Sequence, residues 1–195
     1  MLNPRATNED LTAKARIRNA AMDLFAQHGA DRVSLRAVAA EAGVTLGLVQ
    51  HHFKTKEGLR DAVDLLVVDY FAAAVGSVPA TGTAGEVAGA RDEAVRKMLH
   101  ANPAVVNYIR RALLEPAEAR LGLLDALIDL TRREVTGLRE AGLASTTRSD
   151  SSQIVTVLVR QLGELLLAPM VDVVWERADP GAGATKPSLS ITVRE

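Results

Sequence analysis

The sequence contains no cysteine and few aromatic residues, and both shortages exclude classes of function. Without cysteine there is no disulfide framework, no thiolate zinc site and no cysteine nucleophile. Phe, Tyr and Trp together make up 3% of the 195 residues. RNA-recognition sheets and single-strand channels need a platform of stacking rings, so we expect neither.

Long uncharged apolar runs are also scarce. The longest stretch without Asp, Glu, Lys or Arg covers residues 70–85, and Gly76, Pro79 and Gly82 interrupt it. We therefore expect no membrane-spanning helix. The first ten residues are not followed by the apolar core of a secretory signal. These features predict a cytoplasmic protein that has no membrane partner.

What the sequence does contain is an uneven distribution of charge. Residues 1–60 carry nine Lys and Arg against six Asp and Glu, and they hold three of the four histidines. Residues 61–195 carry fourteen basic residues against eighteen acidic ones. The apolar share of 48% is that of an ordinary globular protein. A mildly basic head followed by an acidic body indicates two functions in one chain.

Apolar residues recur at helical spacing along most of the chain, and hydroxyl residues, glycine and proline mark the boundaries. This pattern predicts helices at about residues 12–28, 35–42, 45–52, 56–75, 86–100, 103–115, 117–140 and 151–175. Pro169 is expected to break or kink the last helix. Residues 76–85, rich in Gly, Pro, Ser and Thr, are the predicted loop.

The fold class predicted from this order is all-α, with an N-terminal three-helix head joined by a long helix to a larger helical bundle body. The predicted domains are residues 1–55 for the head, 56–178 for the body and 179–195 for a mobile tail. Within the tail, Leu189, Ile191 and Val193 alternate with polar residues. This alternation leaves open a tail that docks as a strand.

Residues 35–53 have the steric pattern of a helix-turn-helix motif. Ala39 is small where two helices would touch, Gly43 permits a positive φ in the turn, and Val49 would lock the second helix onto the first. An ordinary helical hairpin is the alternative. The residues that face away from this core favour DNA, because compact hydrogen-bonding groups on a two-turn helix fit the major groove.

The adjacent histidines of the second helix could instead bind a metal ion. His51 and His52 point about 100° apart on a helix, and no other histidine or carboxylate follows either at the i+4 spacing. We therefore predict no metal site, and the sequence implies no cofactor.

Residues 15–63, "ARIRNAAMDLFAQHGADRVSLRAVAAEAGVTLGLVQHHFKTKEGLRDAV", resemble the N-terminal domain of the TetR/AcrR family of transcriptional regulators. The resemblance includes Ala21, Leu24, Phe25 and Gly29 of the first helix, the block from Ser34 to Val44, and the motif from His51 to Leu59. It implies that Thr45 and Gly47 open the recognition helix and that His51 touches DNA. It also implies that Ser34 and Lys56 hold phosphates, and that Arg36 reaches a base or the backbone.

This chain departs from the family at three positions of the second helix. The family often has a basic or small residue where Leu46 stands, and aromatic residues where Gln50 and His52 stand. The usual tyrosine contacts to phosphate are therefore absent. The predicted DNA-contacting residues are Ser34, Arg36, Thr45, Leu46, Gly47, Gln50, His51, His52 and Lys56.

For the body, the resemblance implies a homodimer formed by the last two long helices and a pocket for a small-molecule effector. Plain core packing is the alternative for each residue assigned to either role. An inward-facing Arg110 or Arg111 would favour an anionic effector. The predicted interface residues are Ile154, Val157, Leu158, Gln161, Leu162, Leu165, Met170 and Val173. The predicted effector residues are Tyr70, Met98, His100, Tyr108, Arg111 and Trp175.

The sequence thus predicts a homodimeric regulator that binds a double-stranded DNA operator, most simply a repressor released by a small molecule. An enzyme is disfavoured, because no nucleophile and base stand at an interpretable spacing. A protein-interaction adaptor that keeps the fold without binding an operator is the remaining alternative.

Overall fold

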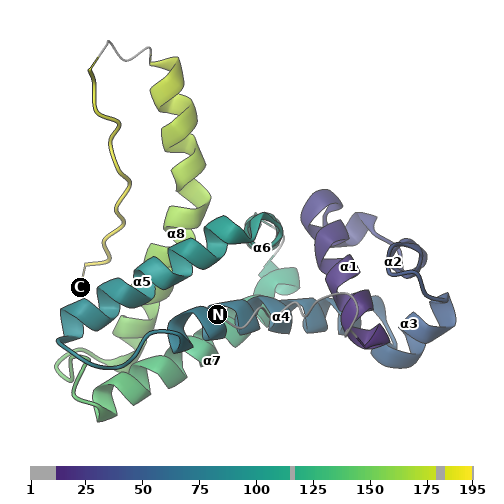
Figure 1. Cartoon of the computed structure of the whole chain (residues 1–195), viewed down its shortest axis with the longest axis horizontal. Coiled ribbons are helices and arrows are strands. Elements are labelled where there is room, and N and C mark those ends of the chain that lie inside the picture. Colours follow the sequence, from purple (N-terminus) through teal and green to yellow (C-terminus); the bar gives the residue numbers. More distant parts are fainter. Residues whose placement is uncertain (1–11, 115–116, 179–182, 195) are drawn as a thin grey trace. The chain divides into compact units, whose positions relative to one another are not determined.

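The computed structural model describes residues 12–114, 117–178 and 183–194, and the elements in these ranges are all helical (Figure 1). They confirm the all-α prediction. In chain order they are α1 (Ala13–His28), the 3-10 turn η1 (Ala30–Arg32), α2 (Leu35–Glu41), α3 (Leu46–Phe53), α4 (Lys56–Gly76), α5 (Ala84–Ala101), α6 (Pro103–Leu114), α7 (Ala117–Glu140) and α8 (Asp150–Arg177).

Most of these helices begin at a hydroxyl residue that caps them. In each case the side-chain oxygen accepts the backbone N–H three residues later, at 3.1–3.3 Å. Such a cap satisfies one of the N–H groups that a helix start leaves without a partner. The caps explain why helix starts could be read from the sequence to within about two residues. The capping residues are Thr12, Ser34, Thr45, Thr55, Thr83 and Ser149.

The start of α5 has a complete capping box. The backbone N–H and the hydroxyl of Thr83 both donate to Oε2 of Glu86 at 2.8 Å. The backbone hydrogen bond, followed by the hydroxyl one, holds the pKa of Glu86 below its ordinary value. This box lets α5 begin two residues before the predicted Glu86, so it shortens the predicted loop at residues 76–85.

The chain divides into two compact units, residues 1–130 and 131–195, and each is described by itself. In the first unit, α1 packs against α2, α4 and α6, and α5 packs against α4 and α6. The fully buried side chains include Ile17, Phe25, Val49, Leu59 and Ile109. The compact unit therefore extends well beyond the predicted head at residues 1–55, because α1 of the head packs on helices of the predicted body.

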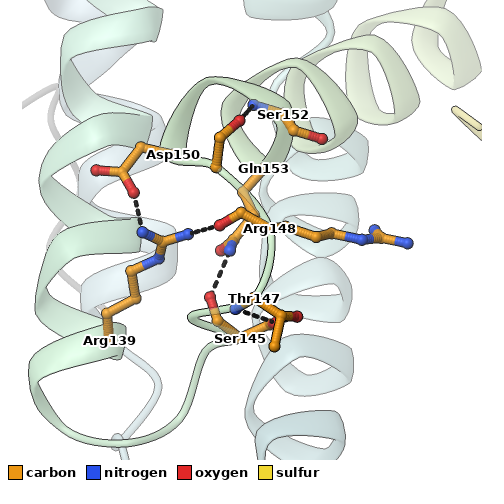
Figure 2. A network of polar contacts seen from close by, with 8 residues as sticks. Arg139, Ser145, Thr147, Arg148, Asp150, Ser152 and Gln153 are labelled. Atoms are coloured by element: carbon orange, nitrogen blue, oxygen red, sulfur yellow. Dashed lines mark hydrogen bonds and ion pairs between the residues drawn. The ribbon is translucent and has the colours of Figure 1, made fainter. Parts of the chain in front are cut away.

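In the second unit, polar contacts hold the turn between α7 and α8 (Figure 2). The Arg139 guanidinium pairs with Asp150 and donates to the carbonyl oxygen of Arg148. The side-chain amide of Gln153 donates to the carbonyl oxygen of Ser145. Because these contacts join the end of α7 to the start of α8, they fix how the two helices enter and leave the turn.

The helix α8 continues through Pro169, so the helix is not broken there, and a kink at this proline stays a prediction. A proline within a helix removes one backbone hydrogen-bond donor. Among the described residues, α8 alone is long and apolar enough, by length and composition, to cross a membrane. Its apolar character is not evident as an uncharged run in the sequence, because Arg160 and Glu164 lie within it.

Candidate nucleic-acid interface

The helices α2 and α3 form the helix-turn-helix motif that the spacing predicted. Val38 and Val49 are completely buried and Ala39 is nearly so, which places them at the contact between the helices. Gly43 adopts φ +64° in the turn, where a side chain would be strained. The backbone N–H of Val44 then donates to the carbonyl oxygen of Ala39 at 2.9 Å. The turn is therefore built by the residues that the sequence singled out.

The outer face of α3 presents hydrogen-bonding groups to solvent. Thr45, Gly47, Gln50 and His51 are exposed, and Leu46 and His52 are half-buried. The rings of His51 and His52 meet edge to face, with centroids 5.3 Å apart. This face matches the size of a recognition helix, and its amide, hydroxyl and imidazole groups can read base edges in a major groove.

The residues predicted to hold phosphates lie at helix starts. Ser34 and Arg36 are exposed at the start of α2. Lys56 opens α4 and is half-buried, and its Nζ donates to the carbonyl oxygen of Asp31 in η1 at 3.0 Å. An ammonium group has three N–H donors, so Lys56 can both hold the η1 turn and donate to a phosphate.

The junction between α3 and α4 contains two residues that the sequence reasoning missed. Lys54 ends α3 with φ +63°, an unusual conformation for a residue with a side chain. Gly58, in the first turn of α4, approaches the end of α3 closely. A Cβ added to Gly58 would lie 2.5 Å from the carbonyl oxygen of Phe53, a backbone atom. The sequence signal for this close approach was a glycine in the first turn of a well-capped helix.

Glu57 lies beside this junction on the surface. Hydrogen bonds from its own backbone N–H and from the Thr55 hydroxyl lower its pKa. The carboxylate is therefore ionised at neutral pH and sits at the start of α4, where the helix dipole favours negative charge.

Three of the predicted effector residues lie in the core of the first unit. Tyr70, Met98 and Tyr108, from α4, α5 and α6, are each at least 95% buried. The Tyr108 hydroxyl donates to Oδ1 of Asp64 on α4 at 2.5 Å, and Asp64 is itself 5% exposed. This buried polar pair joins α6 to α4.

Of the other predicted effector residues, His100 is exposed near the end of α5, and Trp175 lies in α8 of the second unit. Arg111 is exposed, and its guanidinium does not point into the body's core. Its Nε donates to the carbonyl oxygen of Ala26 at 2.8 Å, and its Nη2 to that of Gln27 at 2.7 Å.

Arg111 therefore links α6 to the last turn of α1. The final carbonyl groups of a helix have no partner within it, and a guanidinium is well suited to them in charge and shape. The contact that the structure shows for Arg111 joins α6 to α1, and its place in an effector pocket stays a prediction. Sequence periodicity could not show this, because the two ends of the contact are about 85 residues apart.

The predicted interface residues on α8 divide into two groups. Ile154, Leu162 and Leu165 are buried within the single chain, so they are not available to a second copy. Val157, Leu158 and Gln161 are half-buried, while Met170 and Val173 are exposed. The exposed apolar residues form one row along the helix, which we name the α8 stripe: Val155, Val159, Leu167, Met170, Val173 and Val174.

Residues 17–63 match the sequence model described as bacterial regulatory proteins, tetR family. A curated relative from Mycobacterium tuberculosis (strain ATCC 25618 / H37Rv), the HTH-type transcriptional regulatory protein RaaS, is 57% identical over 60 residues. These residues make up 31% of this chain and 28% of RaaS, so this chain matches only a little over a quarter of that relative's length.

Two solved structures share the fold over nearly the whole chain. One, from Shewanella sp. PV-4, is assigned to the tetR family of transcription regulators. It is 25% identical with a TM-score of 0.59, and the match covers 86% of this chain and 91% of that one. The other is the multidrug binding protein EbrR complexed with imidazole. It is 24% identical with a TM-score of 0.59, over 94% of this chain and 100% of that one.

Proposed function

We propose, because the N-terminal domain of this chain belongs to the tetR family of bacterial regulatory proteins, that the protein is a sequence-specific DNA-binding transcriptional regulator. The observation that carries the proposal is the exposed face of α3, held on α2 by Val38 and Val49. The protein acts in the cytoplasm on a double-stranded operator. Its simplest role is that of a repressor.

A salt-dependent mobility shift on DNA that flanks the gene tests this function. The wild-type protein should protect a roughly palindromic site, and its affinity should fall steeply as salt rises, because phosphate contacts release counterions. DNA affinity that does not depend on salt, or a footprint without symmetry, would favour the alternative function, a protein-interaction adaptor that keeps the fold without binding an operator.

Two variants separate the roles of the contacting residues in the same assay. Lys56→Ala should weaken binding to all sequences alike and reduce the salt slope by about one, whereas Gln50→Ala should change the preferred base at a cost of about 1–3 kcal/mol. Lys97→Ala is the control, because it removes the same charge from an exposed site on α5. The assignment fails if Lys56→Ala alters base preference while Gln50→Ala weakens all sites equally.

The protein acts as a homodimer, since two heads are needed to address two half-sites. The α8 stripe supplies an apolar surface that the single chain leaves exposed. A second copy explains this surface better than a lipid bilayer does, because Arg160 and Glu164 lie in the middle of the same helix. Self-association without detergent is therefore expected.

The effector is a small molecule that binds among α4, α5 and α6 in the body. EbrR, which shares the fold, is described as a multidrug binding protein. Binding can alter operator affinity only if the effector prefers one arrangement of the heads. Both α4, which begins at the head, and α6, which Arg111 ties to α1, can transmit that preference.

Arg111→Met tests the link between α6 and α1. The variant keeps the apolar stem but removes both donors, so the last turn of α1 should exchange its amide hydrogens roughly tenfold faster, which corresponds to a loss of about 1.4 kcal/mol from the two hydrogen bonds. Operator affinity should change with it, even without an effector. Arg110→Met, which removes the neighbouring charge, should leave exchange in residues 26–29 unchanged. Equal rates of amide hydrogen exchange in residues 26–29 of the two variants would show that Arg111 does not hold the last turn of α1.

A further inference from the structure

The C-terminal segment, residues 183–194, is an extended chain that forms no strand, and it contacts α8 through Lys186 and Ile191. Leu189, Ile191 and Val193 are half-buried, whereas Ser190 and Thr192 between them are exposed. An extended chain turns successive side chains to opposite sides. One side of this segment is therefore apolar and covered, and the other faces solvent.

Two contacts fix where the segment runs. The Lys186 ammonium pairs with Asp172 near the end of α8. Ile191 lies on Gly163, so closely that a Cβ added to the glycine would be 2.5 Å from Cδ1 of Ile191. The helix rises about 13.5 Å between Asp172 and Gly163, and five extended residues span about 16.5 Å. The segment therefore runs antiparallel to α8, and Figure 1 shows its course beside the helix.

Gly163 lies in the middle of the α8 stripe. It is four residues from Val159 and four from Leu167, and this spacing places all three on one face of the helix. A glycine is where a neighbouring backbone or side chain can approach a helix most closely. Ile191 already fills that space, so a second helix could not pack there until Ile191 leaves.

The segment holds α8 weakly and covers little of it. The Lys186–Asp172 pair is about half exposed, with 47% and 56% of the side-chain surfaces accessible, and pairs of this kind add little stability. Val159 and Leu167 remain 46% and 44% exposed beside the glycine. A second copy can therefore bury much more apolar surface than the segment does.

We propose that residues 186–193 form a strap that covers the centre of the α8 stripe in the single chain and leaves it when a second copy binds. The strap competes with dimerisation and so raises the concentration at which the dimer forms. This inference rests on the proposed homodimer. The strap adds an autoinhibitory segment to that homodimer.

The test compares Ile191→Asp with Thr192→Asp in a dilution series followed by analytical ultracentrifugation. Both variants add one carboxylate to the strap, but only position 191 faces the helix. Ile191→Asp should lower the dimer dissociation constant about tenfold, the effect of losing one half-buried isoleucine contact. Thr192→Asp should stay within about twofold of the wild type.

A second measurement detects the strap independently of the dimer. Because the chain has no cysteine, Ile191→Cys and Thr192→Cys each introduce a single thiol. In dilute protein the thiol at position 191 should react severalfold more slowly with maleimide than the one at 192. At protein concentrations high enough for the dimer to form, the two thiols should react with maleimide at the same rate.

The outcomes separate this inference from the proposed homodimer. A dissociation constant that is unchanged or higher in Ile191→Asp would overturn the strap while leaving the dimer, as would equal thiol rates in dilute protein. If the wild type and both aspartate variants stay monomeric at every concentration, the proposed homodimer is refuted. The proposed competition between the strap and a second copy is then refuted as well. Slow labelling at position 191 would then show only that the strap docks.

Discussion

Gly58→Ala is expected to destabilise the first unit by about 2–3 kcal/mol, a typical cost of forcing atoms into a packed site. The added Cβ would lie 2.5 Å from the Phe53 carbonyl oxygen. Because that oxygen belongs to the backbone, it cannot rotate away, and either the end of α3 or the start of α4 must shift. Operator affinity should fall as well, since this junction sets the direction of the recognition helix relative to α4.

Gly89→Ala provides the matched control for this substitution. Gly89 lies within α5, and an added Cβ there would meet no atom within 4 Å. Alanine is favoured over glycine in a helix by about 1 kcal/mol, so this variant should be slightly more stable than the wild type. Thermal unfolding would measure the stability of both variants. If the two variants shift the melting temperature in the same direction, the close approach at Phe53 is absent.

Met170→Glu is expected to raise the dimer dissociation constant by at least about a hundredfold, which corresponds to about 2.7 kcal/mol. Met170 is 60% exposed in the single chain, so the folded monomer should tolerate the carboxylate. In a symmetric apolar interface, however, each copy would bury one charge without a partner. Operator affinity should fall in parallel, because a monomer addresses a single half-site.

Two other glutamate substitutions on α8 make this result specific. Ala168 is exposed on the other side of the helix from the stripe, so Ala168→Glu adds the same charge and should leave the dimer intact. Leu162 is buried within the chain, so Leu162→Glu should lower the melting temperature rather than affect association alone. An intact Met170→Glu dimer in sedimentation would place the interface outside the α8 stripe.

The head could be predicted closely from the sequence because its determinants are local. The capping hydroxyls of Thr45 and Thr55 act within three residues of their helix starts, and Gly43 lies between the two helices that it connects. Spacings of this kind define the helix-turn-helix motif without information from the rest of the chain.

The residues of the body were predicted less well because periodicity shows which residues share a face but not what covers that face. Both sides of α8 are apolar, and the sequence favoured Ile154 and Leu162 for the interface. These two proved to be buried within the chain, while Val155 and Met170 are exposed. In the same way, the sequence favoured Arg111 as an effector ligand, whereas in the structure its guanidinium donates to two carbonyl oxygens of α1.

The sequence by itself determined the helix boundaries, the helix-turn-helix motif and the face of α3 that the motif presents, because caps, turns and side-chain spacing act over a few residues. Only the tertiary structure decided that Arg111 joins α6 to α1, that Gly58 must lack a side chain and that Ile191 occupies the centre of the α8 stripe. The first and last of these contacts join segments about 85 and 28 residues apart, and the Gly58 contact depends on the path of the backbone at Phe53. Such contacts depend on how the elements pack, and packing is not encoded in any local pattern.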